Sequence, residues 1–130
     1  MGIERSSGGF VRTGWVVSGL VIAFLVFDGV TKVMQVQPVI DACARLGIGA
    51  TTAAAIGALL LAITTLYALP QSRAVGVVLL TGYLGGAVAT HVRAGSNLFE
   101  TLFPVGFGAL AWLGIALRDP ELVRTILLRR

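Results

Sequence analysis

Four long apolar stretches dominate the chain, at residues 14–35, 48–69, 74–92 and 98–117. Each approaches the ~20 residues that an α-helix, rising about 1.5 Å per residue, needs to cross the hydrocarbon of a bilayer. Inside hydrocarbon the backbone must satisfy its own hydrogen bonds, and four short spans cannot close a barrel. The pattern therefore predicts an all-α fold, a bundle of four transmembrane helices that forms one domain over residues 1–130.

Short connections separate the four stretches. Gln37 and Pro38 are expected to end the first helix, because proline disfavours helical geometry in the residue before it. Residues 69–73 and 94–97 contain the proline, glycine, serine and asparagine that favour tight turns. Residues 119–121 end the fourth helix, and residues 121–130 are typical of a short amphipathic tail. The spacing of Gly82 and Gly86 predicts that the third helix packs closely against a neighbour.

The composition agrees with a membrane protein and excludes several other classes. The 130 residues are 56% hydrophobic and only 12% charged, with a mean hydropathy of +0.91. Because a soluble domain is roughly 25% charged, this chain could not cover a globular surface with polar side chains. An ordinary soluble domain, a disordered chain and a nucleic-acid module are excluded. One cysteine and one histidine exclude an internal disulfide, a cysteine-rich metal site and a haem held by two histidines of this chain. We therefore expect no metal and no resident cofactor.

The charges predict an orientation in the membrane. The first stretch is too long for a secretory signal and carries Asp28 and Lys32, so we interpret it as a retained helix. Seven basic residues lie at the termini and at the turn between the second and third helices, and three lie near the other face. The seven are Arg5, Arg12, Arg73, Arg118, Arg124, Arg129 and Arg130, and the three are Lys32, Arg45 and Arg93. The positive-inside rule therefore predicts that both termini are cytoplasmic.

Polar residues gather in the half of the bundle that this topology places outside. Asp28, Thr31, Lys32 and Gln35 are spaced i, i+3, i+4, i+7 and share one helical face. A charged side chain within a span costs a few kcal/mol or more and usually faces the bundle interior. We therefore predict an outward-opening polar pocket, with Asp28 and His91 within direct or single-water hydrogen-bonding reach. Its candidate catalytic residues are Asp28, His91 and Glu100, and its candidate ligand-binding residues are Lys32, Tyr83, Thr90 and Arg93.

These residues also have purely structural interpretations. Asp28 and Lys32 form a local i, i+4 pair on this view, and His91 suits the negative end of a helix dipole. Asn97 and Glu100 have the spacing of a capping box. Arg93 would be solvated or bound to lipid headgroups. Cys43 would be an inert residue of the first external loop.

The sequence resembles the DoxX-like family of small four-helix membrane proteins. The resemblance covers roughly residues 14–125 and is carried by FDGVTK at 27–32, LPQSR at 69–73 and GYLGGAVATHVRAG at 82–95. It implies a four-helix bundle in the cytoplasmic membrane of a bacterium, as a multi-pass protein. Better-known relatives are associated with quinone-linked sulfur oxidation, oxidative-stress complexes and membrane-protein assembly. Asp28, Lys32, His91 and Arg93 match recurrent positions of the family.

Three functions remain open. The leading hypothesis is a binding protein for a lipophilic molecule, a quinone or an isoprenoid-like lipid, whose polar end lies near Asp28, Lys32 and His91. Such a protein would serve a redox-linked complex only with a membrane redox partner, because the chain has no electron carrier of its own. The second is an acid–base enzyme, an isomerase, a cyclase or an epoxide-opening enzyme, that uses Asp28, His91 and Glu100. The third is a structural subunit or assembly factor, and a homo-oligomer is also open. The expected surroundings are a lipid bilayer, without nucleic acid.

Overall fold

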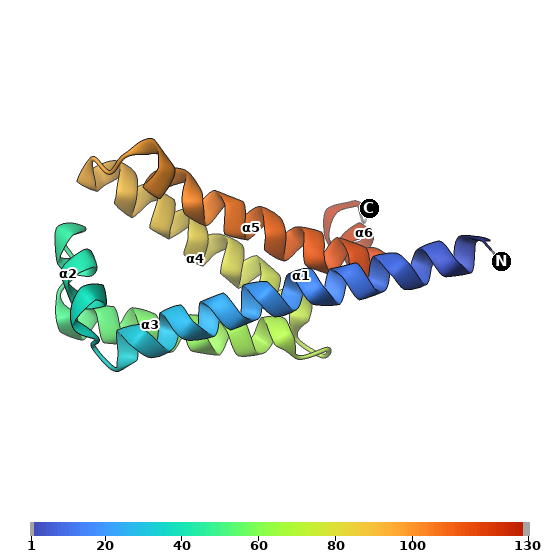
Figure 1. Cartoon of the computed structure of the whole chain (residues 1–130), viewed down its shortest axis with the longest axis horizontal. Coiled ribbons are helices and arrows are strands. Elements are labelled where there is room, and N and C mark those ends of the chain that lie inside the picture. The colour runs from blue at the N-terminus through green and yellow to red at the C-terminus, as the bar shows by residue number, and fades with distance from the viewer. Residues whose placement is uncertain (1, 129–130) are drawn as a thin grey trace.

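The computed structural model describes the backbone of residues 2–128 and the side chains of residues 9–128. The described chain forms six α-helices and no strand, which confirms the all-α prediction. In chain order they are α1 (Gly2–Val33), α2 (Gln37–Arg45), α3 (Ala50–Ala68), α4 (Arg73–Ala94), α5 (Leu98–Arg118) and α6 (Pro120–Leu128) (Figure 1). The side chain of Arg5, together with Arg129 and Arg130, lies outside the described part.

Four of the described helices are long and apolar enough to cross a membrane. They are the segment Gly9–Val33 of α1, and the whole of α3, α4 and α5. These spans match the four apolar stretches, so the predicted bundle of four transmembrane helices is confirmed. The cytoplasmic location of both termini stays a prediction.

The four spans form two pairs that diverge along the bundle. α1 packs against α3 and α5, and α4 packs against the same two helices. Figure 1 shows the α1–α3 pair close to the α4–α5 pair at the end that carries the chain termini, and the two pairs spread apart toward α2. The short helix α2 stands at that far end and packs on α3 and α1.

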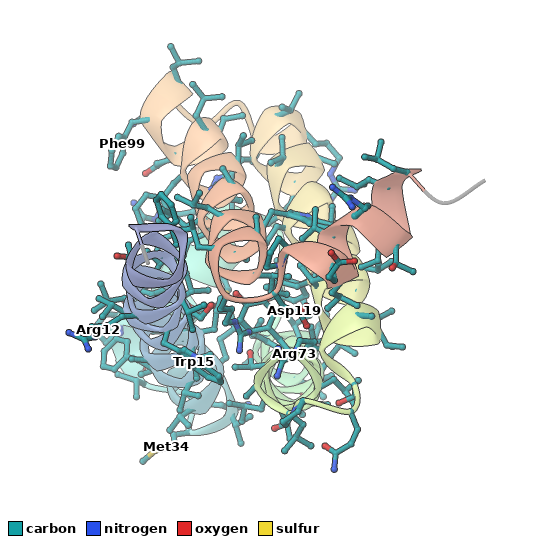
Figure 2. All side chains as sticks on the ribbon, turned by 90° about the vertical axis from the view of Figure 1, so that its right-hand side faces the viewer. Arg12, Trp15, Met34, Arg73, Phe99 and Asp119 are labelled. Atoms are coloured by element: carbon teal, nitrogen blue, oxygen red, sulfur yellow. The ribbon has the colours of Figure 1, made fainter. Side chains whose placement is uncertain are left out.

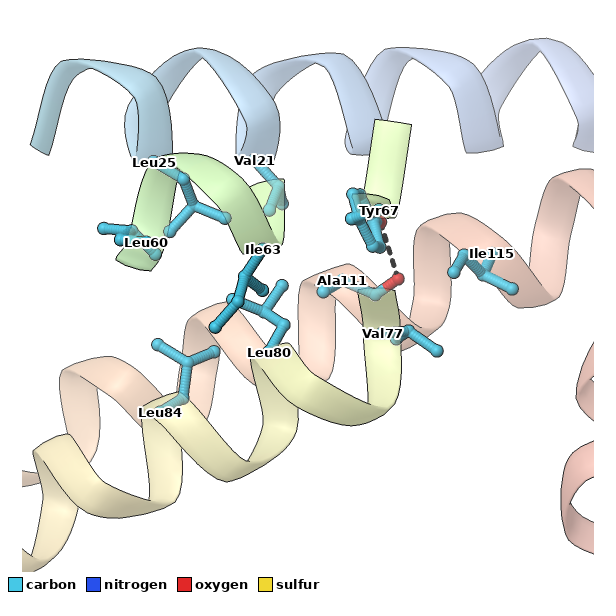
Figure 3. Packing of buried hydrophobic residues seen from close by; sticks show 10 residues of the cluster. All are labelled: Val21, Leu25, Leu60, Ile63, Tyr67, Val77, Leu80, Leu84, Ala111 and Ile115. Carbon is cyan, nitrogen blue, oxygen red and sulfur yellow. Dashed lines mark hydrogen bonds between the residues drawn. The ribbon is translucent and has the colours of Figure 1, made fainter. Parts of the chain in front are cut away.

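The buried cluster lies where the two pairs are close (Figure 3). It consists of Val21, Leu25, Leu60, Ile63, Tyr67, Val77, Leu80, Leu84, Ala111 and Ile115. The Tyr67 hydroxyl donates a hydrogen bond to the carbonyl oxygen of Ala111 at 2.8 Å, which joins α3 to α5. Because that hydroxyl has a single proton, the Ser18 hydroxyl at 3.2 Å must be the donor of the second bond, which joins α1 to α3.

Close backbone approach at glycines holds this region together. A Cβ atom on Gly76 would lie 2.2 Å from the Tyr67 backbone nitrogen, and one on Gly114 would lie 2.3 Å from the Ser18 Oγ. Lipid chains are as apolar as leucine, so helices in a bilayer associate through such close contacts and hydrogen bonds. The prediction that Gly82 and Gly86 serve this purpose is wrong. A Cβ on either would meet no described atom within 4 Å.

Helix α2 was not predicted, and its presence corrects the reading of Pro38. Helix α1 ends at Val33 in a Schellman turn: the Val36 N–H donates to the Thr31 carbonyl at 3.1 Å, and Gln35 takes the left-handed conformation with φ +56°. Pro38 then stands in the first turn of α2, where its missing N–H costs no helical hydrogen bond. It therefore begins the second helix instead of ending the first.

The other expected connections are confirmed. α3 and α4 are joined by the short turn after Ala68, and Gly95, with φ +72°, ends α4. The predicted amphipathic tail is helix α6, which packs Leu122, Val123 and Ile126 against the buried cluster. Helix α6 thus covers the bundle at the end that carries the termini (Figure 1).

Candidate functional site

A cavity of about 660 Å³ occupies the half of the bundle in which the helix pairs diverge. Side chains from α1, α2, α3, α4 and α5 line it. Leu25 and Leu84 belong both to its wall and to the buried cluster, so the cavity begins where the packed core ends. Its volume lies within the roughly 300–1,000 Å³ that is usual for small-molecule sites.

An ion pair from α1 lines this largely apolar space. The Lys32 ammonium lies 2.6 Å from Oδ2 of Asp28, and the exposed fractions of the two side chains are 15% and 32%. A close helix contact sets this position: a Cβ on Gly57 of α3 would lie 2.7 Å from both the Gly29 carbonyl oxygen and the Lys32 Cβ. The glycines thus bring α1 against α3, on the turn that carries the pair. The prediction that Asp28 and Lys32 face the interior is confirmed.

His91 and Thr90 line the cavity from the end of α4. The Nδ1 atom of half-buried His91 lies 3.0 Å from the Ser96 hydroxyl, which fixes the ring just before the Gly95 turn. Thr90 donates its hydroxyl to the Gly86 carbonyl at 2.8 Å. Asp28 and His91 therefore border one space, but each bonds to a neighbour on its own side of it, and the described structure shows no direct hydrogen bond between them.

Tyr83 is the polar residue that reaches the cavity from deeper in α4. It lines the cavity and also packs against the buried cluster, as expected of a residue at the floor. Tyr67 uses its hydroxyl in two hydrogen bonds, whereas the Tyr83 hydroxyl has none with the described residues. The Tyr83 hydroxyl, which can both donate and accept a hydrogen bond, is therefore free to bond to a ligand.

Aromatic side chains of α1 and α5 form an apolar wall. The rings of Phe24 and Phe107 are stacked with centroids 4.2 Å apart, and Phe103 lies 5.0 Å from Phe107 and 5.8 Å from Phe24. All three line the cavity, beside the buried Pro104. Helix α5 continues through Pro104. Such a wall offers a large apolar contact area to a ligand.

Helix α2 supplies a further side of the cavity, which the sequence pattern did not predict. Val39, Ala42 and Cys43 line it, at the i, i+3, i+4 spacing of one helical face. The opposite face is polar, and Gln37 donates to Asp41 at 2.8 Å. This amphipathic period was the signal that could have identified the helix. Cys43 is thus a buried residue of a helix and not part of an external loop.

Two of the predicted residues do not reach the cavity. Glu100 is exposed, and its backbone N–H donates to the Asn97 side chain at 2.8 Å, which is the capping arrangement. Arg93 is exposed near the end of α4. The structure therefore gathers Asp28, Lys32, Tyr83, Thr90 and His91 around one space and leaves Glu100 and Arg93 outside it. No group of metal-binding side chains is present among the described residues.

The profile of the DoxX-like family matches residues 16–114. The chain belongs to the DoxX-like family. No curated protein and no solved structure matches the chain significantly. The matched range contains all the described residues that line the cavity of this DoxX-like protein and ends before α6.

The arrangement suits a ligand that has an apolar body and one polar end. In this DoxX-like bundle, Lys32 donates hydrogen bonds, Asp28 accepts them, and Tyr83 and His91 are able to do either. These groups lie in a space whose other walls are apolar and aromatic. The DoxX-like cavity thus combines apolar walls with a few hydrogen-bond donors and acceptors.

Proposed function

We propose that this small integral membrane protein binds a lipophilic molecule, a quinone or an isoprenoid-like lipid, in the cavity. The observation that carries the proposal is the ion pair of Asp28 and Lys32 on the wall of an apolar space of about 660 Å³. The polar end of the ligand would bond to this pair and to His91, and its apolar body would lie against Phe24 and Phe107.

The energetics of charges in a membrane support this proposal. Ionisable groups inside a span are costly and usually serve a function. Asp28 uses one carboxylate oxygen to bind Lys32, and the ammonium has three donors, so both groups keep capacity for a further partner.

We place the protein in the cytoplasmic membrane of a bacterium with both termini in the cytoplasm. The basic residues at the end that carries the termini support this orientation. In a redox-linked complex, the bound molecule would exchange electrons with a partner protein.

Mass spectrometry of small molecules that copurify with the protein tests the proposal. Wild type, Asp28→Asn and Lys32→Met are purified identically, with Glu100→Gln as the matched control because Glu100 is exposed and outside the cavity. We expect a lipophilic compound in wild type and control and at least a tenfold loss in the two cavity variants. Equal amounts in all four preparations, or no compound in any, would contradict the proposal.

The second candidate is an acid–base enzyme, an isomerase, cyclase or epoxide-opening enzyme, acting on a molecule in the same cavity. It is favoured by one observation, that Asp28 and His91 line a single space. Conversion of the copurified compound by wild type, and its retention without conversion by His91→Gln, would support catalysis over binding alone.

A further inference from the structure

Two arginines, the buried Arg118 and the half-buried Arg73, lie at the opposite end of the bundle from the cavity. Arg118, the last residue of α5, is only 7% exposed. Its Nε, Nη1 and Nη2 atoms are buried and have no hydrogen-bond partner among the described residues, and neither has Nε of Arg73. From the sequence alone, both arginines were interpreted only as basic residues that indicate the orientation of the protein in the membrane.

Three helices hold the Arg118 guanidinium in place. Its central carbon lies 4.5 Å from the ring centroid of Trp15 on α1 and 5.4 Å from that of Tyr67 on α3. The backbones of α1 and α5 approach closely beside it. A Cβ atom added to Gly14 of α1 would lie only 2.8 Å from the backbone nitrogen of Arg118 on α5. The aromatic faces attract the cation, but the N–H groups around its edge still need acceptors.

Arg73 and Asp119 complete the cluster. Nη1 of Arg73, at the start of α4, lies 3.3 Å from Oδ2 of Asp119, which directly follows Arg118. Figure 2 shows Trp15, Arg73 and Asp119 gathered at this end of the bundle. The cluster contains two guanidinium groups and one carboxylate, so it carries one positive charge in excess. A buried charge with unsatisfied donors is costly unless an opposite charge accepts their hydrogen bonds.

We propose that Arg118 and Arg73 form a binding site for one phosphate-type oxyanion at the end of the bundle that carries the termini. The fork of guanidinium donors matches the oxygens of phosphate, which it binds in bidentate fashion. A free phosphate ion and the phosphate of a lipid headgroup share this chemistry. Trp15, 49% exposed, lies over the guanidinium, and the proposal requires that its side chain move to admit the anion. The inference is independent of the function proposed for the cavity.

Fluorescence of Trp15 provides a direct readout. The chain has two tryptophans, so Trp112→Phe leaves Trp15 as the single reporter, in contact with the guanidinium. In one arm, this protein in neutral detergent is titrated with inorganic phosphate, against chloride at equal ionic strength. In the other arm, phosphatidylglycerol is titrated into the protein in the same phosphate-free detergent, against diacylglycerol, which carries no phosphate. We expect a saturable change in Trp15 emission in at least one arm.

Two substitutions in the Trp112→Phe background test the arginines. Arg118→Gln should weaken the response at least tenfold, whereas Arg124→Gln should leave it unchanged, because Arg124 is 73% exposed at the same end. If thermal unfolding shows that Arg118→Gln does not fold, Arg73→Gln carries the test with the same expected loss.

The outcomes separate the two sources of phosphate and decide the proposal. Saturation by inorganic phosphate identifies a soluble anion, and a response only to phosphatidylglycerol identifies a lipid headgroup. The absence of a response in both arms, or an undiminished response in the folded arginine variants, would overturn the proposal.

Discussion

The two halves of the membrane bundle use the same helices in opposite ways. In the terminus-side half, which contains the buried cluster around Tyr67, Leu80 and Ile115, the four spans touch closely. In the cavity-side half, which contains Asp28 and His91, the same spans diverge around about 660 Å³ of space. Figures 1 and 3 show this change along α4 and α5, which leave the packed cluster and separate from α1 and α3.

Glycines of α4 show the difference most directly. Gly76 lies against the backbone of Tyr67. Gly82 and Gly86, further along the same helix, line the cavity, and a Cβ atom on either would meet no described atom within 4 Å. Small residues thus serve close packing in one half and leave room in the other. Because helices in lipid associate through contacts and not through a hydrophobic driving force, the terminus-side half supplies the association. The cavity-side half is then free to hold charged groups.

The largest effect should come from alanine at the tight glycine. A Cβ at position 76 would lie 2.2 Å and 2.4 Å from the nitrogen and Cα of Tyr67, and backbone atoms yield less readily than flexible side chains. We expect Gly76→Ala to lower the free energy of unfolding in detergent by about 3 kcal/mol or more, as overpacking does.

The matched control is Gly86→Ala on the same helix. Its Cβ meets nothing within 4 Å, and alanine favours a helix over glycine by about 0.5–1 kcal/mol, so its stability should be unchanged or slightly higher. Similar losses in the two variants would show that the halves do not differ in packing.

The sequence predicted the four spans well, because hydropathy over about 20 residues is set by the bilayer. The predicted stretches 48–69 and 98–117 differ from Ala50–Ala68 and Leu98–Arg118 by no more than two residues at either end. Helix α2 was not predicted because it is short and half polar, so it contains no long apolar run. The start of α1 at Gly2 was also missed, since its first residues are polar and carry no membrane signal.

The site was predictable only where the signal lay within one helix. The shared face of Asp28 and Lys32 follows from their spacing, and their inward placement follows from the cost of charge in lipid. The aromatic wall and the position of Cys43 depend on how separate helices cross, which spacing along one helix does not specify. The burial of Arg118 depends on Trp15 from the first span. For the same reason, the spacing of Gly82 and Gly86 predicted a helix face of small residues but could not predict which neighbouring helix, if any, that face contacts.

The second-largest change in stability is expected for variants of the Asp28–Lys32 ion pair in the cavity-side half. Lys32→Met leaves the Asp28 carboxylate without its partner, and we expect a loss of about 2 kcal/mol, below that of a fully buried pair because both groups border the cavity. Asp28→Asn combined with Lys32→Met should recover most of this loss, since no charge then remains unpaired. Thermal unfolding in detergent measures both, with Arg93→Met as the exposed control. Equal stability of the single and double variants would count against the pairing.

The smallest effect compares the two tyrosines of the chain, one in each half. Tyr67→Phe removes the two hydrogen bonds to Ala111 and Ser18 and should cost about 1–2 kcal/mol of unfolding free energy, since each bond has a net value of about 0.5–1.5 kcal/mol. Tyr83→Phe removes a hydroxyl without a described protein partner, so stability should change by no more than a few tenths of a kcal/mol. Retention of the copurified molecule should show the reverse order, with a loss for Tyr83→Phe and none for Tyr67→Phe. If both variants lost stability equally and retained the molecule equally, Tyr83 would be a packing residue, and the polar floor of the cavity would have no role in binding.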